Sequence, residues 1–313
     1  FDRVNFYKLF DKLMYRGVPA IYIRLLMFWY THQEFMVRWG GTFSESFLVG
    51  NGVRQGGVLS PVLFKVYMDG LSSVLNTLNT GCYFNGVLIN HLMYADDLVI
   101  ISPSIRSMQI LLSHCDSYAD LHDVKFNTKK SKCMLFKSND IQITSGHSLF
   151  LSSKKLTFVS EHNYLGVILC SNECDDFSID KQCKGVYARG NFILRHFRHC
   201  TDEVKILLFN SYCTSFYCSA LWHCFKSSSI RRLKTAYNRI FRLFFCINGQ
   251  VSISWNLLTR NLNPFEVLLR KRSFSLRSRL YNSNNSIVDN IVNSTFSMTS
   301  KLHQRWDKTL FNF

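Results

Sequence analysis

Proline is scarce in this sequence, with 4 residues among 313, and glycine contributes only 15 more. Disordered and linker segments are usually rich in these residues, so their scarcity argues against long segments of that kind. Hydrophobic residues make up 47% of the chain and aromatic residues 15%. A chain of this length and composition can bury a sizeable core, and we expect it to hold two subdomains.

Acidic residues are also few, since 21 Asp and Glu stand against 37 Lys and Arg. The formal net charge is +16 and the isoelectric point is near 9.4. A folded protein with this excess of positive charge is typical of those that bind a polyanion, most simply a nucleic acid. The alternative is a generally basic surface without a specific partner.

The eleven cysteines lack the paired spacing of a zinc finger or a dithiol redox site. No Cys-x-x-Cys pair occurs, and His196, His199 and Cys200 have no matching second pair. The odd number and scattered positions predict reduced thiols in an intracellular protein, most of them packed as small hydrophobic residues. A zinc site at the three neighbouring residues is the alternative.

Signals for secretion and membrane insertion are lacking as well. The chain has no signal peptide, and residues 1–5 lack an initiator methionine and begin as if within a strand, so we expect a truncated chain. Residues 207–225 carry no Asp, Glu, Lys or Arg, but their Asn, Ser, Thr and His residues make them too polar for a membrane span. We expect a buried helix there and no association with a membrane.

Hydrophobic spacing predicts helices alternating with short strands up to about residue 169, and basic helices beyond residue 175. The composition changes near residue 172, which is the best domain boundary. Helices are expected at 5–16, at 20–33 with Ile21, Leu25, Phe28 and Trp29 on one side, at 60–76 and at 105–119. Strands are expected at 35–39, 46–49, 87–94, 98–101 and 132–136, followed by further short strands.

The most informative segment is Tyr94-Ala95-Asp96-Asp97, which lies between two apolar runs. This pattern predicts a tight β-hairpin with two carboxylates at its tip. Adjacent carboxylates on a rigid tip suit Mg²⁺, which prefers oxygen ligands and binds one or two carboxylates together with substrate phosphates. The alternative for this segment alone is a solvated turn.

A glycine-rich loop, Asn51-Gly52-Val53-Arg54-Gln55-Gly56-Gly57, precedes the helix expected at 60–76. Glycine lets a backbone approach a flat or charged ligand closely. Arg54 can meet a phosphate, and Gln55 offers both a donor and an acceptor to a base. The start of the following helix favours anions in the same region.

Five blocks, in a fixed order, resemble the reverse transcriptases of non-LTR (LINE-type) retrotransposons. They are Phe1-Asp2-Arg3-Val4-Asn5, residues 52–61, Tyr94-Ala95-Asp96-Asp97, residues 126–132 and Tyr164-Leu165-Gly166-Val167. In that order they resemble the tail of the first catalytic motif, the template- and nucleotide-contacting motif, the catalytic hairpin, the fourth motif and the primer-grip turn. Residues 212–222 and 264–270 also resemble jockey-like members of the family.

The resemblance implies an RNA-directed DNA polymerase, a nucleotidyltransferase that extends a primer 3′-hydroxyl with two Mg²⁺ ions, for which Mn²⁺ can substitute. Asp2 and Asp96 would be the main metal ligands. Asp97 would be a secondary ligand, because neighbouring strand residues point to opposite faces unless the turn intervenes. Lys130 is the candidate catalytic lysine at the departing pyrophosphate, with Lys129 and Lys132 as alternatives.

Further site residues follow from the same resemblance. Arg3 would offer its carbonyl to a metal, and Tyr7, or alternatively Phe6, would floor the sugar pocket. The residues expected to bind the nucleotide are Arg3, Tyr7, Gln55 and Gly56. Those expected to contact template or primer are Arg54, Tyr94, Tyr164, Leu165 and Gly166.

The implied fold class is α+β. A reverse-transcriptase palm, an antiparallel sheet with helices packed on one face, would span residues 1–172, and a helical thumb would span 173–250. A C-terminal helical extension would span 251–313, and the fingers subdomain, which precedes the first motif, would be missing. Basic residues at 231–242, interleaved with Tyr237 and Phe241, are predicted to follow a phosphate backbone. The implied partners are an RNA template, a DNA primer and deoxynucleoside triphosphates, in a nuclear or cytoplasmic ribonucleoprotein.

Two other readings remain. The chain could be a truncated, catalytically inactive remnant that only binds nucleic acid. It could also be another palm enzyme: a group II intron maturase or telomerase-like protein carries the same acids, and a nucleotidyl cyclase would need no template loop such as Arg54-Gln55-Gly56.

Overall fold

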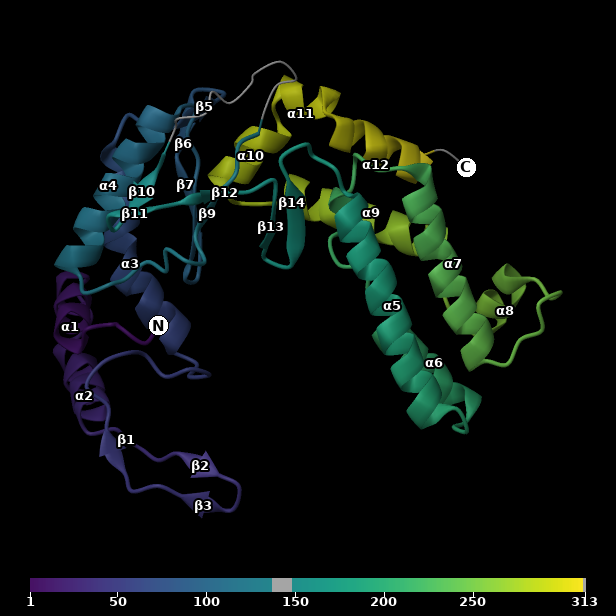
Figure 1. Cartoon of the computed structure of the whole chain (residues 1–313), viewed down its shortest axis with the longest axis horizontal. Helices are drawn as coiled ribbons and strands as arrows, with labels where there is room; N and C mark the ends of the chain where they lie inside the picture. The colour runs from purple at the N-terminus through teal and green to yellow at the C-terminus, as the bar shows by residue number, and fades with distance from the viewer. Residues whose placement is uncertain (137–147, 312–313) are drawn as a thin grey trace. The chain divides into compact units, whose positions relative to one another are not determined.

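The computed structural model describes residues 1–136 and 148–311 (Figure 1). The described residues form two compact units, the first comprising 1–133 and 148–157 and the second comprising 134–136 and 158–311. The division precedes the change of composition near residue 172, so the turn at Leu165-Gly166 belongs to the helical second unit. The sequence-based domain bounds stay a prediction, and strands expected within 137–147 lie outside the described residues.

Helices and short strands alternate through the first unit, as the sequence predicts. The elements are α1 (Phe6–Tyr15), α2 (Ala20–Thr31), β1 (Glu34–Phe35), β2 (Arg38–Trp39), β3 (Thr42–Phe43), β4 (Phe47–Leu48), α3 (Ser60–Thr77), β5 (Cys82–Phe84), β6 (Val87–Ile89), β7 (His91–Tyr94), β8 (Asp97–Ile100), α4 (Ile105–Leu121), β9 (Lys132–Cys133), β10 (Phe150–Leu151) and β11 (Lys154–Lys155). Strand β12 (Thr157–Phe158) pairs with β9 where this unit ends.

The strands of the described residues pair only in two-stranded ladders, whereas a palm predicts one antiparallel sheet. The strand expected at 87–94 is divided at Asn90 into β6, which pairs with β5, and β7, which pairs with β8. Asn90 is buried, and its side-chain amide donates to the carbonyls of Leu75 and Thr80 at 2.7 and 3.0 Å. These two hydrogen bonds draw the Asn90 side chain toward the end of α3. Asn90 therefore separates β6 from β7.

The core of the first unit lies where α3 packs against α1 and α4. Apolar residues at helical spacing fill it: Phe6, Leu9, Phe10 and Leu13 on α1, Leu63, Phe64, Tyr67, Met68, Leu71 and Leu75 on α3, and Leu111, Leu112, Cys115, Tyr118 and Ala119 on α4. Two buried hydroxyls stay satisfied, because Tyr118 donates to the Tyr67 carbonyl at 2.7 Å and Tyr67 donates to the His122 carbonyl.

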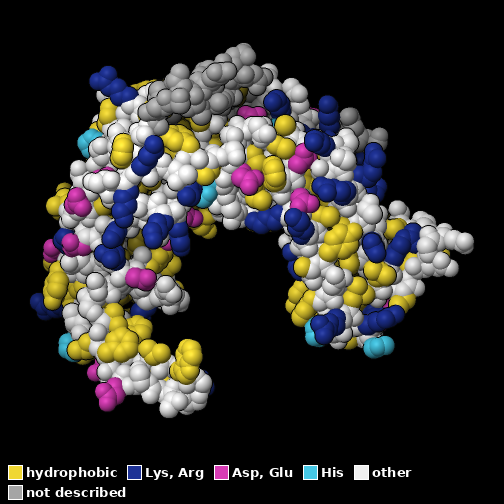
Figure 2. Space-filling view, in the orientation of Figure 1, with side chains coloured by type: hydrophobic (Ala, Val, Ile, Leu, Met, Phe, Trp, Pro, Cys, Tyr) yellow, Lys and Arg dark blue, Asp and Glu magenta, His cyan; other side chains and the backbone are white. Residues whose placement is uncertain are grey.

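The apolar side chains that the sequence places on one side of α2 do not form its buried face. Ile21, Leu25, Phe28 and Trp29 are all exposed, and the helix buries Ile23 and Tyr30 instead. The helix is apolar nearly all round, so spacing alone cannot tell which face packs against α1. Figure 2 shows hydrophobic side chains gathered over the region of α2 and the β1–β4 ribbon, where Trp39 is 86% exposed.

The second unit is mainly helical, and its described residues after Cys170 contain no strand. Its elements are β13 (Glu161–Tyr164), β14 (Val167–Cys170), α5 (Asp176–Phe197), α6 (Asp202–Cys213), the short 3₁₀ helix η1 (Ser219–Leu221), α7 (Ser227–Phe244), α8 (Ile253–Thr259), α9 (Phe265–Tyr281), α10 (Ser286–Val292), α11 (Thr295–Thr299) and α12 (Lys301–Phe311). The helix expected within 207–225 ends at Cys213, and the rest of that stretch is a loop with η1.

Helices α5 and α7 approach closely at Gly190. A Cβ atom at Gly190 would lie 2.5 Å from Ile240 Cγ2, so only glycine lets the two helices meet at this distance. Tyr237 and Phe241 of α7 are completely buried in the same core. Their predicted role beside a phosphate backbone is therefore wrong, because neither ring reaches solvent.

Three further expectations concern absences. All eleven cysteines are free thiols. Within 1–136 and 148–311, no three His, Cys, Asp or Glu side chains lie close enough together to hold a metal. None of the helices among these described residues is long and apolar enough to cross a membrane.

Candidate active site

The β7–β8 hairpin places the two adjacent carboxylates at its tip, as predicted. Tyr94 pairs with Asp97, Ala95 and Asp96 form the two-residue turn, and Ala95 has a positive φ of 53°. A positive φ is strained for a residue with a side chain, and such strain is often found at functional sites. Asp96 lies in the turn and Asp97 opens β8, so the strict alternation of a strand does not separate the two side chains. Both are exposed, as is Tyr94.

The segment that carries Asp2 is held by the glycine-rich loop. The Gly52 amide donates to the Val4 carbonyl at 2.9 Å, and the Val53 amide donates to the Phe1 carbonyl at 3.0 Å. Gly52 has a φ of +89°, and a Cβ atom there would lie 3.0 Å from both the Cα and the carbonyl oxygen of Asp2. A glycine is therefore needed for the loop to hold Asp2, whose side chain remains exposed.

The same loop forms a turn at its tip. The Gly57 amide donates to the Arg54 carbonyl at 3.1 Å, and Gly56, with a φ of +78°, occupies the position that a type II turn reserves for glycine. Gln55 and Gly56 are exposed at this tip, in front of α3. The Gln55 side chain is therefore accessible to a base or a nucleotide.

Arg54 is oriented by one residue of α2 and one that follows this helix. Its Nε donates to Oε1 of the buried Gln33 at 2.9 Å, and its guanidinium lies 5.4 Å from the centre of the Trp29 ring. Arg54 is nevertheless exposed, so these contacts orient the guanidinium without enclosing it. Sequence reasoning found Arg54 but missed Gln33 and Trp29, because neither belongs to a motif.

An open pocket of about 440 Å³ adjoins Asp2. Its lining residues in the described chain are Asp2, Arg3, Asn5, Asn51 and Asp123, and the hairpin carboxylates are not among them. The structure thus brings Asp2 and Arg3 together with an acid that the sequence did not indicate.

Asp123 follows α4 with a left-handed φ of 56°. Its carboxylate accepts from Lys8 Nζ at 2.7 Å and from Asn5 Nδ2 at 3.2 Å. The hydrogen bond from Lys8 lowers the pKa of this carboxyl, so it carries a negative charge at the rim of the pocket at neutral pH. No motif marks Asp123, and only the fold brings it beside Asn5.

The structure distinguishes Phe6 from Tyr7. Phe6 is buried, with its ring centre 5.2 Å from that of Tyr30. Tyr7 lies in the first turn of α1 and is 67% exposed. Of the two candidates for the floor of a sugar pocket, only Tyr7 has a ring that a ligand can reach.

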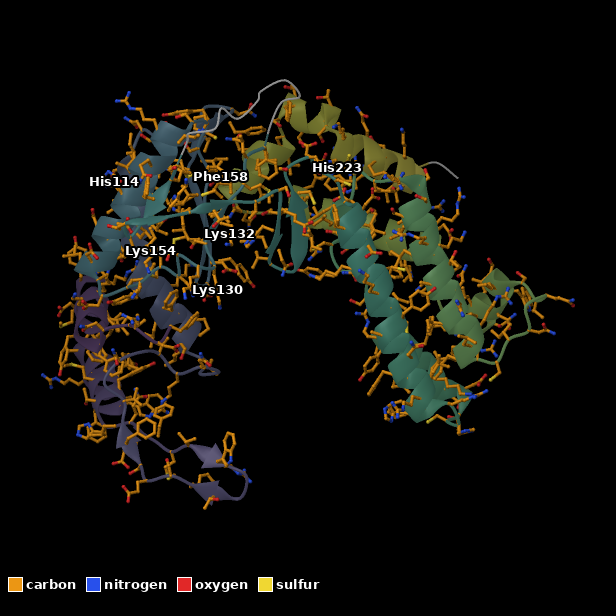
Figure 3. The ribbon with its side chains drawn as sticks, viewed as in Figure 1. His114, Lys130, Lys132, Lys154, Phe158 and His223 are labelled. Carbon is orange, nitrogen blue, oxygen red and sulfur yellow. The ribbon has the colours of Figure 1, made fainter. Side chains whose placement is uncertain are left out.

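Lys130 lies in a turn that Asn127 organises. Asn127 Oδ1 accepts from the amides of Lys129 and Lys130, both at 3.2 Å, and the Asn127 carbonyl accepts from the Lys130 amide at 3.0 Å. Figure 3 labels Lys130 and Lys132 on the segment between α4 and β10. All three candidate lysines of this block are exposed, so the structure does not choose among them.

The predicted primer-grip turn is a two-residue hairpin in the second unit. Tyr164 pairs with Val167, and Leu165 and Gly166 have φ values of 47° and 84°. Two successive positive φ angles are the signature of a type I′ turn, which matches the twist of the flanking strands. Leu165 and Gly166 are exposed, whereas Tyr164 is partly buried.

Comparison with known proteins identifies the family. Residues 1–169 match the family described as reverse transcriptase (RNA-dependent DNA polymerase). This match covers more than half of the chain and includes all five blocks discussed above.

Two curated relatives agree with this match. The chain is 26% identical over 173 residues to the retrovirus-related Pol polyprotein from the type-2 retrotransposable element R2DM of Drosophila melanogaster, covering 53% of this chain and 16% of that protein. It is 25% identical over 177 residues to the Pol polyprotein from the type-1 retrotransposable element R2 of Nasonia vitripennis, covering 54% of this chain and 17% of that protein.

The alignments thus span about one sixth of each relative's length. They confirm the prediction of a reverse transcriptase of the non-LTR type, while the jockey-like resemblance stays a prediction. On the match of residues 1–169 and on both relatives, this chain belongs to the reverse transcriptase (RNA-dependent DNA polymerase) family.

Proposed function

We propose that this chain carries the palm and thumb of an RNA-directed DNA polymerase from a non-LTR retrotransposon. The proposed reaction adds deoxynucleotides to a primer 3′-hydroxyl opposite an RNA template. The observation that carries the proposal is the β7–β8 hairpin, which presents Asp96 and Asp97 at an exposed tip within the segment that matches the family. The net charge of +16 supports a polyanionic template and primer.

Reverse transcriptases generally use divalent metal ions, and the residues of this chain fit Mg²⁺ by their chemistry. Asp2, Asp96 and Asp97 are exposed carboxylates, which are hard oxygen donors. The described residues hold no cluster of three such groups. Mg²⁺ does not require one, because it usually combines one or two carboxylates with substrate phosphates and water. When bound, the two ions would neutralise triphosphate charge and lower the pKa of the primer hydroxyl.

The remaining roles belong to side chains of the first unit. Tyr7 would lie against the sugar, and Gln55 and Gly56 would contact the nucleotide from the exposed loop tip. Arg54, oriented by Gln33 and Trp29, would hold a template phosphate, because a guanidinium can donate two parallel hydrogen bonds. Lys130 would donate a proton to, or neutralise, the departing pyrophosphate.

A second candidate function is nucleic-acid binding without catalysis. The observation that favours it is that the carboxylates of Asp2, Asp96 and Asp97 do not converge in the described residues. A protein of this kind would bind RNA through its positive charge whether or not a divalent metal is present.

Metal removal separates the two functions. We expect extension of a DNA primer on an RNA template in Mg²⁺, its loss when EDTA removes the metal, and its return when Mg²⁺ or Mn²⁺ is restored. Binding of single-stranded RNA, measured by fluorescence anisotropy at matched ionic strength, should persist in EDTA. Undiminished RNA binding together with no extension under any metal condition would favour the second function.

A further inference from the structure

Two side chains from outside the β13–β14 hairpin hold its turn. The Tyr217 hydroxyl donates to the Leu165 carbonyl at 2.9 Å. Lys181 Nζ donates to the Gly166 carbonyl at 2.9 Å and to Asn163 Oδ1 at 3.2 Å. Both carbonyls of the two-residue turn are therefore engaged, and all of these residues belong to the second unit.

The Tyr217 ring also lies against the turn. A Cβ atom at Gly166 would be 3.1 Å from Tyr217 Cε1, which is tighter than an ordinary contact between such atoms. Tyr217 is half-exposed and is followed by Cys218, whose φ is +58°. The loop after α6 thus places the tyrosine over the tip of the hairpin.

Helix α5 fixes the other side of the hairpin. Ser178 Oγ donates to the Ile168 carbonyl at 3.1 Å and accepts from the Ile168 amide at 3.3 Å. Lys181 lies about one turn further along α5, so its ammonium reaches the turn from a helix already docked on β14. The hairpin is consequently attached to α5 at Ile168 and at Gly166.

The turn residues carry two carbonyls and two amides. The carbonyls accept hydrogen bonds from Tyr217 and Lys181, so we consider the two amides as the groups that bind a ligand. Backbone amides commonly bind phosphate oxygens in complexes with nucleic acids. The turn amides can donate to an anion, and the Lys181 ammonium beside them adds positive charge.

We propose that Tyr217 and Lys181 are positioning residues, which lock the Leu165-Gly166 turn so that its amides meet a phosphate of the primer strand. The inference rests on the proposed function, in which this turn holds the primer. Lys181 lies outside every segment that resembles the family, and Tyr217 lies outside the five ordered blocks, within residues 212–222. Their role follows from the hydrogen bonds to Leu165 and Gly166.

The test compares Tyr217→Phe and Lys181→Met with the matched changes Tyr212→Phe and Lys184→Met in the whole chain. Tyr212 lies near the end of α6, and Lys184, on the next turn of α5, pairs with Asp180 at 2.8 Å. Hydrogen exchange at the amides of Tyr164 and Val167, the paired residues that close the turn, measures how stably the turn is held. Fluorescence anisotropy measures affinity for an RNA–DNA primer duplex and for the single-stranded template RNA.

We expect both Tyr217→Phe and Lys181→Met to speed exchange at the turn. Each should weaken duplex binding about threefold to tenfold, as expected when one hydrogen bond is lost, and leave binding of the single-stranded RNA unchanged. Lys181→Arg, which keeps a donor, should restore most of the duplex affinity. The two matched changes should alter neither exchange nor binding.

Duplex affinity that is unchanged in both variants would overturn the proposal, even if the turn exchanges faster. An equal loss of affinity for duplex and single-stranded RNA would also overturn it, because that pattern reports a general structural defect. So would failure of the unaltered chain to prefer the duplex. Primer extension by the unaltered chain is measured in parallel, and its absence would contradict the proposed function without altering the binding comparison.

Discussion

Gly52 shows how a residue without side-chain chemistry can support a reactive one. Its amide is bonded to Val4, its φ is +89°, and its Cα faces the backbone of Asp2. The sequence indicated a loop that approaches a ligand, whereas the structure shows that Gly52 approaches the backbone of Asp2, the residue proposed as a metal ligand. The sequence indicated that a glycine suits this position, but it did not show that Gly52 contacts Asp2.

Gly52→Ala should lower primer extension about tenfold to a hundredfold, because a displaced Asp2 backbone would move its carboxylate away from the reacting groups. Single-turnover extension measures this effect. Gly40→Ala is the matched control, since Gly40 also has a positive φ, 59°, but no atom lies within 4 Å of its Cβ position. Equal activity of the two variants would contradict the account of Gly52.

His91 makes the stability of the first unit depend on pH. Its two ring nitrogens lie 2.7 Å from Ser72 Oγ and from Asn90 Oδ1, which ties β7 to α3. Burial lowers the pKa of His91 below its usual value. The folded state therefore binds a proton less readily than the unfolded chain does, and the stability that depends on neutral His91 is present above pH ~6.5 and falls as pH drops through the lowered pKa.

Thermal unfolding should therefore show a lower Tm at pH ~5 than at pH ~7.5, and His91→Gln should reduce this difference. His114→Gln, on α4, serves as the control and should leave the pH dependence unchanged. His122, whose pKa is also lowered by burial and by Lys12 and Lys8, keeps part of the dependence in either variant. A pH dependence that is the same with and without His91 would contradict this assignment.

At the scale of elements, periodicity was a good guide where one face of a helix is polar. Helices α1, α3 and α4 lie within two residues of their predicted bounds, because buried apolar residues recur at helical spacing on each. Helix α2 was also predicted, but its spacing did not show that Ile23 and Tyr30 are the buried residues, because apolar residues surround the helix. The strand break at Asn90 was missed because it depends on carbonyls of Leu75 and Thr80.

The contact between α5 and α7 makes a prediction at this scale. Gly190→Ala would place a methyl group 2.5 Å from Ile240 Cγ2 and 2.6 Å from Cδ1, inside a core whose residues are fully buried. We expect a loss of about 1–3 kcal/mol in the free energy of unfolding, the usual cost of overpacking. Gly185→Ala on the same helix is the control, because its Cβ would approach only the end of the long Arg189 side chain, 3.0 Å from Nη1. Chemical denaturation that ranks the two variants equally would contradict the close-packing account.

At the scale of the whole molecule, the basic residues fall into two groups. Several basic residues support the fold of the second unit, since Arg272 donates to the Thr214 carbonyl at 2.9 Å, Arg277 pairs with Asp307 at 2.9 Å and Arg232 lies 3.7 Å from Asp180. Others, such as Arg231 and Arg239 on α7, are exposed. Composition predicted a polyanionic partner, but it could not separate structural arginines from those available to a phosphate backbone.

The candidate site was predictable where local sequence alone decides the geometry. The turns at Ala95-Asp96 and at Leu165-Gly166 are both two-residue connections between paired strands. The sequence did not reveal Asp123, or the clamp of Tyr217 and Lys181, because these contacts join segments far apart in the chain. Composition also did not show that the Leu165-Gly166 turn belongs to the second compact unit.

Primer extension by Asp96→Asn tests the central claim most directly. The substitution removes the carboxylate charge at the hairpin tip while keeping nearly the same shape, and Asp120→Asn, on the exposed side of α4, is the matched control. On an RNA template with Mg²⁺, we expect extension by the unaltered chain and the control, and a loss of at least about a hundredfold in Asp96→Asn with RNA binding retained. Extension by Asp96→Asn at the rate of the unaltered chain would contradict the assignment of the hairpin as the catalytic centre.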